Sequence, residues 1–88
     1  MKVWTVQEIE NWNGQVSTKL KLFKNKETAL ECMKVWKELH DGFIRDVEEA
    51  VKSEDSDFVI MEREDYFYCY DGINFDSYEI IIDNMEVL

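Results

Sequence analysis

The dipeptide Asn13-Gly14 constrains the fold of this chain more than any other feature, because it separates two runs rich in β-branched and aromatic residues. Asn-Gly is the strongest short-range signal for a two-residue type I′ turn between antiparallel strands. Such a turn also fixes the register of the strands, and here it places Ile9 opposite Thr18. Residues 2–10 and 16–23 are therefore predicted to form an antiparallel β-hairpin.

The register divides the side chains of the hairpin between two faces, since successive residues of a strand point to opposite sides. The mostly apolar face holds Val3, Ile9, Val16, Leu20 and Leu22. The other face has a charged centre that consists of Glu8, Glu10, Lys19 and Lys21. A pair of strands patterned in this way is expected to have one side in contact with solvent.

From Asn25 onward the spacing of the apolar residues changes to that of a helix. Asn25 is a good N-cap, and the core-facing positions that follow recur at steps of three and four. These positions are Ala29, Met33, Trp36, His40, Phe43, Val47 and Val51. Because the stripe stays in phase across Gly42, the spacing predicts one long helix over 26–52. The alternative is that Asp41-Gly42 ends one helix and a second begins there.

Three further β-rich runs follow the polar connector 53–57 and predict three more strands. The runs are residues 58–61, 66–70 and 78–82. Asp71-Gly72, between the second and third run, predicts another type I′ turn.

The length of the loop at Asp71-Gly72 decides which side chains of the last strands face the helix. A two-residue turn leaves Phe67 and Asp76 pointing outward. A longer loop through Ser77 changes that assignment.

The order strand, strand, helix, strand, strand, strand is typical of an α+β two-layer sandwich. We expect a five-stranded, mainly antiparallel sheet with one long helix across one face. The chain has 88 residues, of which 45% are hydrophobic, and this is enough for one hydrophobic core. Residues 1–88 are therefore expected to form a single domain.

Three segments resemble small bacterial and phage proteins of unassigned function: residues 2–6 (KVWTV), 12–14 (WNG) and 22–29 (LFKNKETA). In such proteins a hairpin runs into a helix and strands close the chain, often near an ending similar to residues 85–88. The resemblance implies the same fold and identifies no catalytic residue.

The chain is strongly acidic, with 20 acidic and 10 basic residues and a net charge of −10. Residues 1–45 hold eight bases and six acids, whereas residues 46–88 hold two bases and fourteen acids. A field of this sign repels phosphate backbones, so direct nucleic-acid binding is not expected. It would attract a protein with a basic surface, although a solvated acidic surface can also serve solubility alone.

Aromatic residues alternate with the acids of the C-terminal half, and this combination suits a protein partner. The candidate partner-binding residues are Glu62, Glu64, Asp65, Tyr66, Tyr68, Asp71, Asp76 and Glu79. The leading hypothesis is a non-enzymatic module that docks on a basic or nucleic-acid-binding surface of another protein. Its small size and charge are similar in composition to phage-encoded DNA mimics and anti-CRISPR inhibitors.

Two alternatives remain open from the sequence. The chain could be a self-associating structural domain that covers its aromatic strand face in a homodimer. It could also be a small ligand-binding or hydrolytic domain whose pocket residues the sequence does not reveal.

No residue pattern supports catalysis, a metal or a cofactor. His40 is the only histidine, and its place on the apolar stripe indicates a packed structural role. Asp71, Asn74, Asp76 and Glu79 carry oxygen ligands, but their spacing does not follow the calcium-loop pattern. Phosphate-binding glycine motifs and paired-histidine zinc motifs are absent from the sequence.

The remaining expectations concern compartment. Cys32 and Cys69 form no metal-binding or disulfide pattern, so two reduced, buried thiols are expected. Acids occur near the start before any apolar run of signal-peptide length, and no window reaches 18 uncharged apolar residues. The chain is therefore expected to be cytoplasmic, with no membrane contact.

Overall fold

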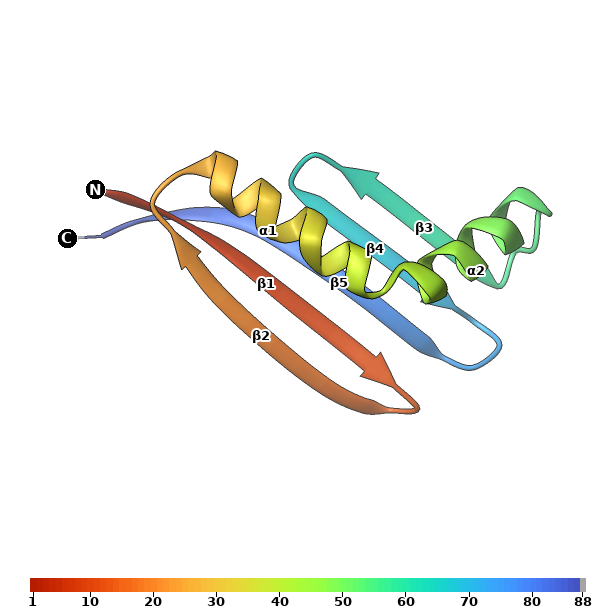
Figure 1. Ribbon diagram of the computed structural model, residues 1–88. Helices are drawn as coiled ribbons and strands as arrows, with labels where there is room; N and C mark the ends of the chain where they lie inside the picture. Colours follow the sequence, from red (N-terminus) through yellow and green to blue (C-terminus); the bar gives the residue numbers. More distant parts are fainter. Residues whose placement is uncertain (88) are drawn as a thin grey trace.

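A computed structural model describes residues 1–87 (Figure 1). Within these residues the elements follow the order strand, strand, helix, helix, strand, strand, strand. They are β1 (Lys2–Trp12), β2 (Gln15–Phe23), α1 (Lys26–Leu39), α2 (Asp41–Lys52), β3 (Phe58–Arg63), β4 (Tyr66–Asp71) and β5 (Asp76–Glu86).

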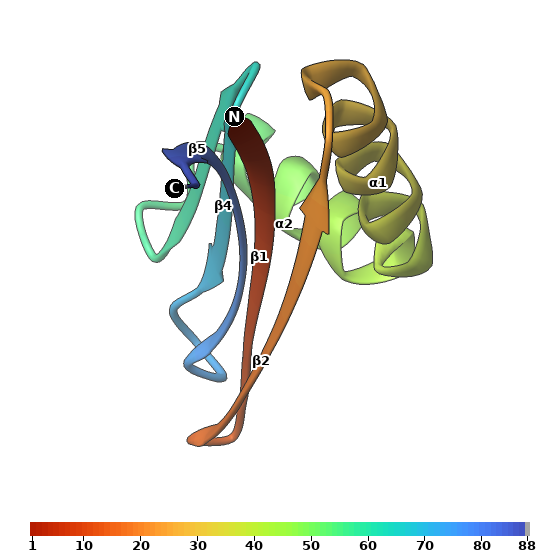
Figure 2. The same cartoon turned by 90° about the vertical axis from the view of Figure 1, so that its left-hand side faces the viewer.

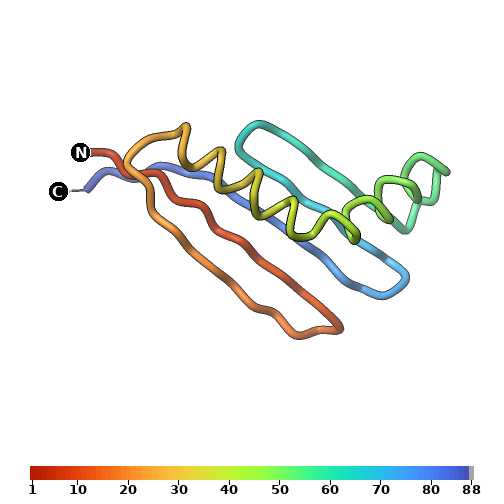
Figure 3. Tube along the Cα trace, viewed as in Figure 1, coloured from red at the N-terminus to blue at the C-terminus, as the bar shows by residue number. Residues whose placement is uncertain are grey.

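The strands form one antiparallel sheet in the order β2-β1-β5-β4-β3. Both helices lie on the same side of this sheet, α1 along β1 and β2 and α2 beside β3 and β4, as Figure 2 shows. The chain thus has the predicted α+β two-layer architecture with a five-stranded antiparallel sheet. The first and last residues that the structure describes lie side by side because β1 pairs with β5 (Figure 3), and the backbone N–H of Val87 donates to the carbonyl of Met1 at 2.8 Å.

The first hairpin has the predicted turn and register. Asn13 and Gly14 both adopt positive φ angles, 55° and 82°, as a type I′ turn requires. Gln7 pairs with Leu20 and Ile9 with Thr18, which confirms the register expected from the sequence.

The face of the hairpin that the helices cover is the one with the charged centre. Val6 is fully buried there, and Glu8 is only 3% exposed. Lys19 and Lys21 lie on the same side, and their ammonium groups reach the Trp36 ring at 5.0 and 6.0 Å from its centroid. The charged side chains are stabilised there by contacts with aromatic rings and hydrogen-bond donors of α1 and β5. The apolar side of the hairpin is therefore left uncovered.

The prediction of one helix over 26–52 is wrong, because the helical stretch is interrupted at His40. The φ and ψ angles of His40, −114° and 21°, are not helical. Its backbone N–H donates to the Lys37 carbonyl, and its own carbonyl accepts the N–H of Ile44 in α2. The alternative, in which a second helix begins at Asp41-Gly42, is close to what the structure has, since α2 starts at Asp41. The apolar stripe stays in phase across the break, so residue spacing alone did not reveal it.

The loop between β4 and β5 is longer than two residues. Asp71 pairs directly with Asp76, so residues 72–75 form the loop. Phe67 consequently pairs with Ile80 and is 1% exposed, which makes its outward placement by a two-residue turn wrong. The loop is set by the Asp71 carboxylate, whose Oδ1 accepts the backbone N–H of Ile73 at 2.9 Å.

The hydrophobic core lies between the sheet and the two helices. Its buried residues are Val6, Ala29, Met33, Trp36, Ile44, Val47, Phe67, Cys69, Tyr78, Ile80 and Ile82. The burial of Trp36 confirms the predicted phase of the stripe. Both cysteines are free, but only Cys69 is fully buried, while Cys32 is partly exposed. Across residues 1–87, no helix has the length and apolar character needed to cross a membrane.

Candidate protein-binding face

The side of the sheet opposite the helices is uncovered, and we call it the open face. It consists of the alternate strand residues that point away from α1 and α2. These are Val3, Thr5, Gln7, Ile9 and Asn11 of β1, Val16, Thr18, Leu20 and Leu22 of β2, Val59, Met61 and Arg63 of β3, Tyr66, Tyr68 and Tyr70 of β4, and Ser77, Glu79, Ile81, Asp83 and Met85 of β5.

Strand β2 contributes an aliphatic strip to one side of the open face. Val16, Leu20 and Leu22 are each about 60% exposed, although they belong to the most apolar residue types. Contiguous exposed apolar groups on a small protein indicate an interaction site more often than chance exposure does. The turn at Asn13-Gly14 places these three residues on one face of the hairpin, and the helices cover the opposite face.

Strand β4 contributes a row of tyrosines to the other side. The rings of Tyr68 and Tyr70 are stacked, with 6.5 Å between centroids, and the Tyr66 hydroxyl donates to the Glu79 carboxylate. This hydrogen bond, together with partial burial, raises the pKa of Tyr66 to about 12. Burial also raises the pKa of Tyr68. The phenols of Tyr66 and Tyr68 are therefore neutral near pH 7. The row presents flat rings with polar tips, which suits protein contacts.

The open face is almost uncharged. Among its residues only Arg63, Glu79 and Asp83 are ionisable at neutral pH, and one of these is a base. The other acids of the chain lie in the helices, in the connecting loops or on the helix side of the sheet. The aliphatic strip and the tyrosine row thus share a face that carries little net charge.

The structure brings only three of the eight predicted partner-binding residues together. Tyr66, Tyr68 and Glu79 are neighbours on the open face. Glu62 lies on the helix side, where the Lys37 ammonium donates to it at 2.5 Å.

The other four predicted acids lie in two different turns. Glu64 and Asp65 connect β3 to β4, and Glu64 forms an ion pair with Lys26 at 2.5 Å, which raises the pKa of that lysine. At the β4–β5 loop, Asp76 accepts the backbone N–H of Asn13 at 2.9 Å.

The carboxylate of Asp71 also serves the β4–β5 loop. Burial acts to raise its pKa, but hydrogen bonds from Asn74 and Ile73 outweigh that effect and lower it. The predicted acids are thus distributed among ion pairs and turn contacts and do not form one patch.

Sequence reasoning missed the part of the open face that β2 supplies. The signal was present, because the register of the hairpin separates Val16, Leu20 and Leu22 from the charged residues. An alternating strand does not show which of its two faces a helix will cover. The covered face is determined by the residues of α1 and β5 that contact its charged side chains. These residues lie far from β2 in the sequence.

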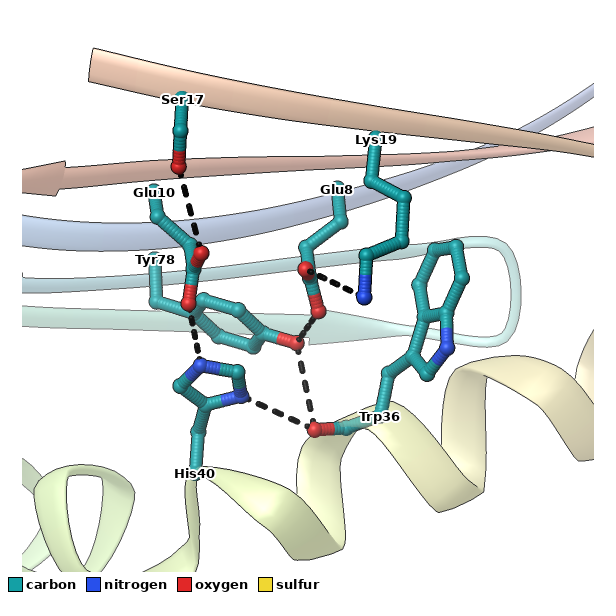
Figure 4. A network of polar contacts seen from close by, with 7 residues as sticks. All are labelled: Glu8, Glu10, Ser17, Lys19, Trp36, His40 and Tyr78. Carbon is teal, nitrogen blue, oxygen red and sulfur yellow. Dashed lines mark hydrogen bonds and ion pairs between the residues drawn. The ribbon is translucent and has the colours of Figure 1, made fainter.

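A network of polar contacts lies between the sheet and the junction of the helices (Figure 4). Tyr78 donates its hydroxyl proton to Glu8 at 2.5 Å, and burial together with this bond raises the pKa of Tyr78. The His40 Nδ1 lies 3.1 Å from the Trp36 carbonyl, which can only accept, so Nδ1 carries a proton. The Nε2 of His40 bonds to Glu10.

This network joins the helix junction to the sheet and has a structural role. The His40 ring stacks on Tyr78 with 4.1 Å between centroids, and every buried side-chain nitrogen or oxygen within residues 1–87 has a hydrogen-bond partner. Lys19 lies 3.8 Å from the Glu8 carboxylate. The packed role predicted for His40 agrees with this geometry, since each of its ring nitrogens is engaged by the protein itself.

A shallow groove of about 450 Å³ lies between α1, α2 and β3. Its apolar floor includes Leu30, Met33 and Ile44, and the Lys37–Glu62 ion pair lies along it. Within the described residues no three His, Cys, Asp or Glu side chains are placed to hold a metal ion.

No protein-family model matches this chain, and searches of the curated proteins and of the solved structures also gave no match.

Proposed function

We propose that this protein is a non-enzymatic interaction module that binds another protein surface through its open face. The observation that carries the proposal is the uncovered sheet face with an aliphatic strip on one side and a tyrosine row on the other. A sheet in a two-layer fold that is covered on one side normally presents polar residues on the other. Here the pattern is reversed on β2, whose polar residues Lys19 and Lys21 point to the helix side.

The chemistry of the open face specifies the partner surface. Tyrosine and aliphatic side chains bind by burying apolar area, and they are enriched at the centre of protein interfaces. With Arg63, Glu79 and Asp83 as its ionisable residues, the face gives little attraction to a highly charged surface. The expected partner therefore presents a flat, largely apolar surface to the sheet.

The competing hypothesis is that the acidic residues bind a basic protein surface, as those of a DNA-mimic or anti-CRISPR-like inhibitor would do. It has less support because Glu62 and Glu64 already pair with lysines of α1. The carboxylates of Asp71 and Asp76 also accept backbone hydrogen bonds of nearby turns. The two outcomes differ in their response to salt, since screening weakens attraction between opposite charges.

The test is capture with the immobilised chain from a lysate of cells that also express the chain itself, compared between variants. Leu20→Lys puts a charge on the open face, and Leu39→Lys makes the same change at the exposed end of α1, where Leu39 is 72% exposed. Glu64→Lys with Asp65→Lys reverses two acids of the competing surface. We expect Leu20→Lys alone to abolish capture of specific proteins, both at low and at high salt.

Loss of capture from the acid reversal, together with release at high salt, would contradict the open-face proposal and support the basic-partner outcome. Retention of every captured protein by Leu20→Lys would also contradict it. Circular dichroism of each variant confirms that the fold is intact before the comparison is made.

A further inference from the structure

We infer that the surface that covers the open face is the open face of a second copy of this chain, so that two sheets pack face to face. This inference rests on the proposed function and names its partner. Three properties of the open face carry it: its size, its charge and the arrangement of its two sides.

The size of the open face approaches that of a stable dimer interface. In the arrangement described below, the overlapping strands contribute 17 of its residues, five of β1, four of β2, three of β4 and five of β5, while β3 lies outside the overlap. A standard stable interface takes roughly 20–30 residues from each partner. Two sheets that pack in this way also form the sandwich arrangement known from single domains, with about 10 Å between them.

The distribution of charge permits two identical copies to meet at this face and at few others. The chain carries a net charge of −10, so most pairs of surfaces would bring acids together. The open face holds only Glu79 and Asp83 as acids and has Arg63 as a base. The Glu79 carboxylate is in addition hydrogen-bonded to Tyr66 of the same chain.

The two sides of the open face complement each other across a two-fold axis. In the order β2-β1-β5-β4-β3, strands β2 and β4 lie on either side of the β1–β5 pair. A two-fold axis along the strands, between β1 and β5, places β2 of each copy over β4 of the other. Leu20 and Val16 then pack on the tyrosine rings of the second copy, and Glu79 lies over β1 instead of over its own counterpart.

This arrangement predicts an unusual response to salt. Two copies that each carry −10 repel one another, and the interface itself has no strong charge attraction. Added salt screens the repulsion, so it should strengthen the dimer. Binding to a basic partner responds in the opposite direction.

The experiment is sedimentation of the purified full chain over a concentration series, at low, physiological and high sodium chloride. We expect the mass to rise from 10.6 kDa toward twice that value with concentration, and the dissociation constant to fall as salt is added. Leu20→Lys should weaken the dimer at least tenfold because it buries a charge, and Leu22→Lys should act in the same direction. The matched control Leu39→Lys should leave dissociation unchanged.

A chain that stays monomeric at all concentrations and salts would overturn the inference. A dimer that weakens with salt, or that Leu39→Lys disrupts and Leu20→Lys does not, would overturn it as well. The lysate experiment distinguishes failure of the dimer from failure of the open face as a binding surface. If the chain is monomeric but Leu20→Lys still abolishes capture, the second copy is wrong as the partner and the open face stands as the binding surface.

Discussion

At the scale of single residues, the contact between Tyr78 and Glu8 decides how a carboxylate can lie beneath the helices. Glu8 is 3% exposed, and its partners are the Tyr78 hydroxyl at 2.5 Å and the Lys19 ammonium at 3.8 Å. A buried charge without hydrogen bonds is costly, so the hydroxyl is required for the charged face of the hairpin to be the covered one.

Tyr78→Phe should therefore reduce the free energy of unfolding by roughly 1–3 kcal/mol, because it leaves the buried Glu8 without its closest donor. Urea denaturation measures this change. Tyr70→Phe, on the open face, serves as the control and should stay within about 0.5 kcal/mol. Equal effects of the two substitutions would show that the Tyr78 hydroxyl does not support Glu8.

Trp36 contributes mainly through packing. It is buried in the core, and Lys19 and Lys21 extend over its ring. Trp36→Ala should lower the free energy of unfolding by roughly 3–5 kcal/mol because it leaves a large cavity. The neighbouring Val35→Ala, at a site that is 45% exposed, should have almost no effect in the same denaturation assay. A change of Trp36→Ala within the range of surface substitutions would contradict this packing.

Groups with raised pKa values, among them Cys69 and Tyr66, predict a loss of stability in alkaline solution. Burial raises the pKa of the Cys69 thiol to about 12, and the Glu79 hydrogen bond raises that of Tyr66 to about 12. The folded state thus keeps protons that the unfolded state loses from about pH 9–10, and this contribution to stability declines as pH rises toward 12.

Urea denaturation at several pH values between 8 and 11 tests the sign of this effect. The free energy of unfolding should fall as pH rises. In Tyr66→Phe the decline above pH 10 should be shallower, because one of the contributing groups is gone. An identical decline in the variant would mean that the bond between Tyr66 and Glu79 does not hold the phenol proton.

At the scale of elements, two glycines show why equal-looking signals lead to different structures. Gly42 lies inside α2, and a Cβ there would meet no atom within 4 Å. At Gly72 a Cβ would lie 2.1 Å from the carbonyl oxygen of Asp57, which accepts the Gly72 N–H. Only the second glycine is required by its surroundings.

Gly42→Ala should consequently stabilise the protein by roughly 0.5–1 kcal/mol, through better helix propensity and a less flexible unfolded chain. Gly72→Ala should destabilise it, since the backbone of the connector 53–57 would have to move. Thermal melting of both variants gives the comparison. A destabilising Gly42→Ala would indicate that the start of α2 needs a conformation that alanine cannot adopt.

The sequence predicted the elements that depend on local signals. The type I′ turn at Asn13-Gly14 fixed the register of β1 and β2, and Asn25 began α1 as an N-cap whose side chain accepts the N–H of Thr28. The break at His40 lies next to Asp41-Gly42, where the sequence allowed a second helix to begin, but the unbroken phase of the apolar stripe favoured one helix. The β4–β5 loop was also undetermined, since Asp71-Gly72 fits both a two-residue turn and the longer loop.

Of the predicted site residues, Tyr66, Tyr68 and Glu79 lie together on the open face, because Tyr66 and Tyr68 alternate along β4 and Glu79 pairs with Tyr68. Their role in binding stays a prediction. The predicted acidic patch required that distant turns meet, and the fold instead places Glu62 and Glu64 beside lysines of α1. Which face of β2 is uncovered depends on the side of the sheet on which the helices pack. The local pattern of β2 does not indicate that side.

At the scale of the whole molecule, the net charge of −10 should make stability increase with salt. The ion pairs of Lys26, Lys37 and Arg45 neutralise only a few of the acids. Screening weakens the remaining repulsion, so the melting temperature should rise with sodium chloride. Measurement at low protein concentration keeps the effect separate from self-association. A flat or falling melting temperature would show that the acids do not repel one another in the folded chain.

The central claim is that the open face, and no other surface, is where this protein binds its second copy. Backbone amide NMR spectra recorded on dilution test it most directly, because resonances report each strand and helix separately. Our account predicts concentration-dependent shifts at Thr18, Ile9 and Tyr68, which lie in one row across the open face, with little change along the exposed side of α1 and α2. Shifts confined to the helices or to the β4–β5 loop, or none at any residue, would contradict it.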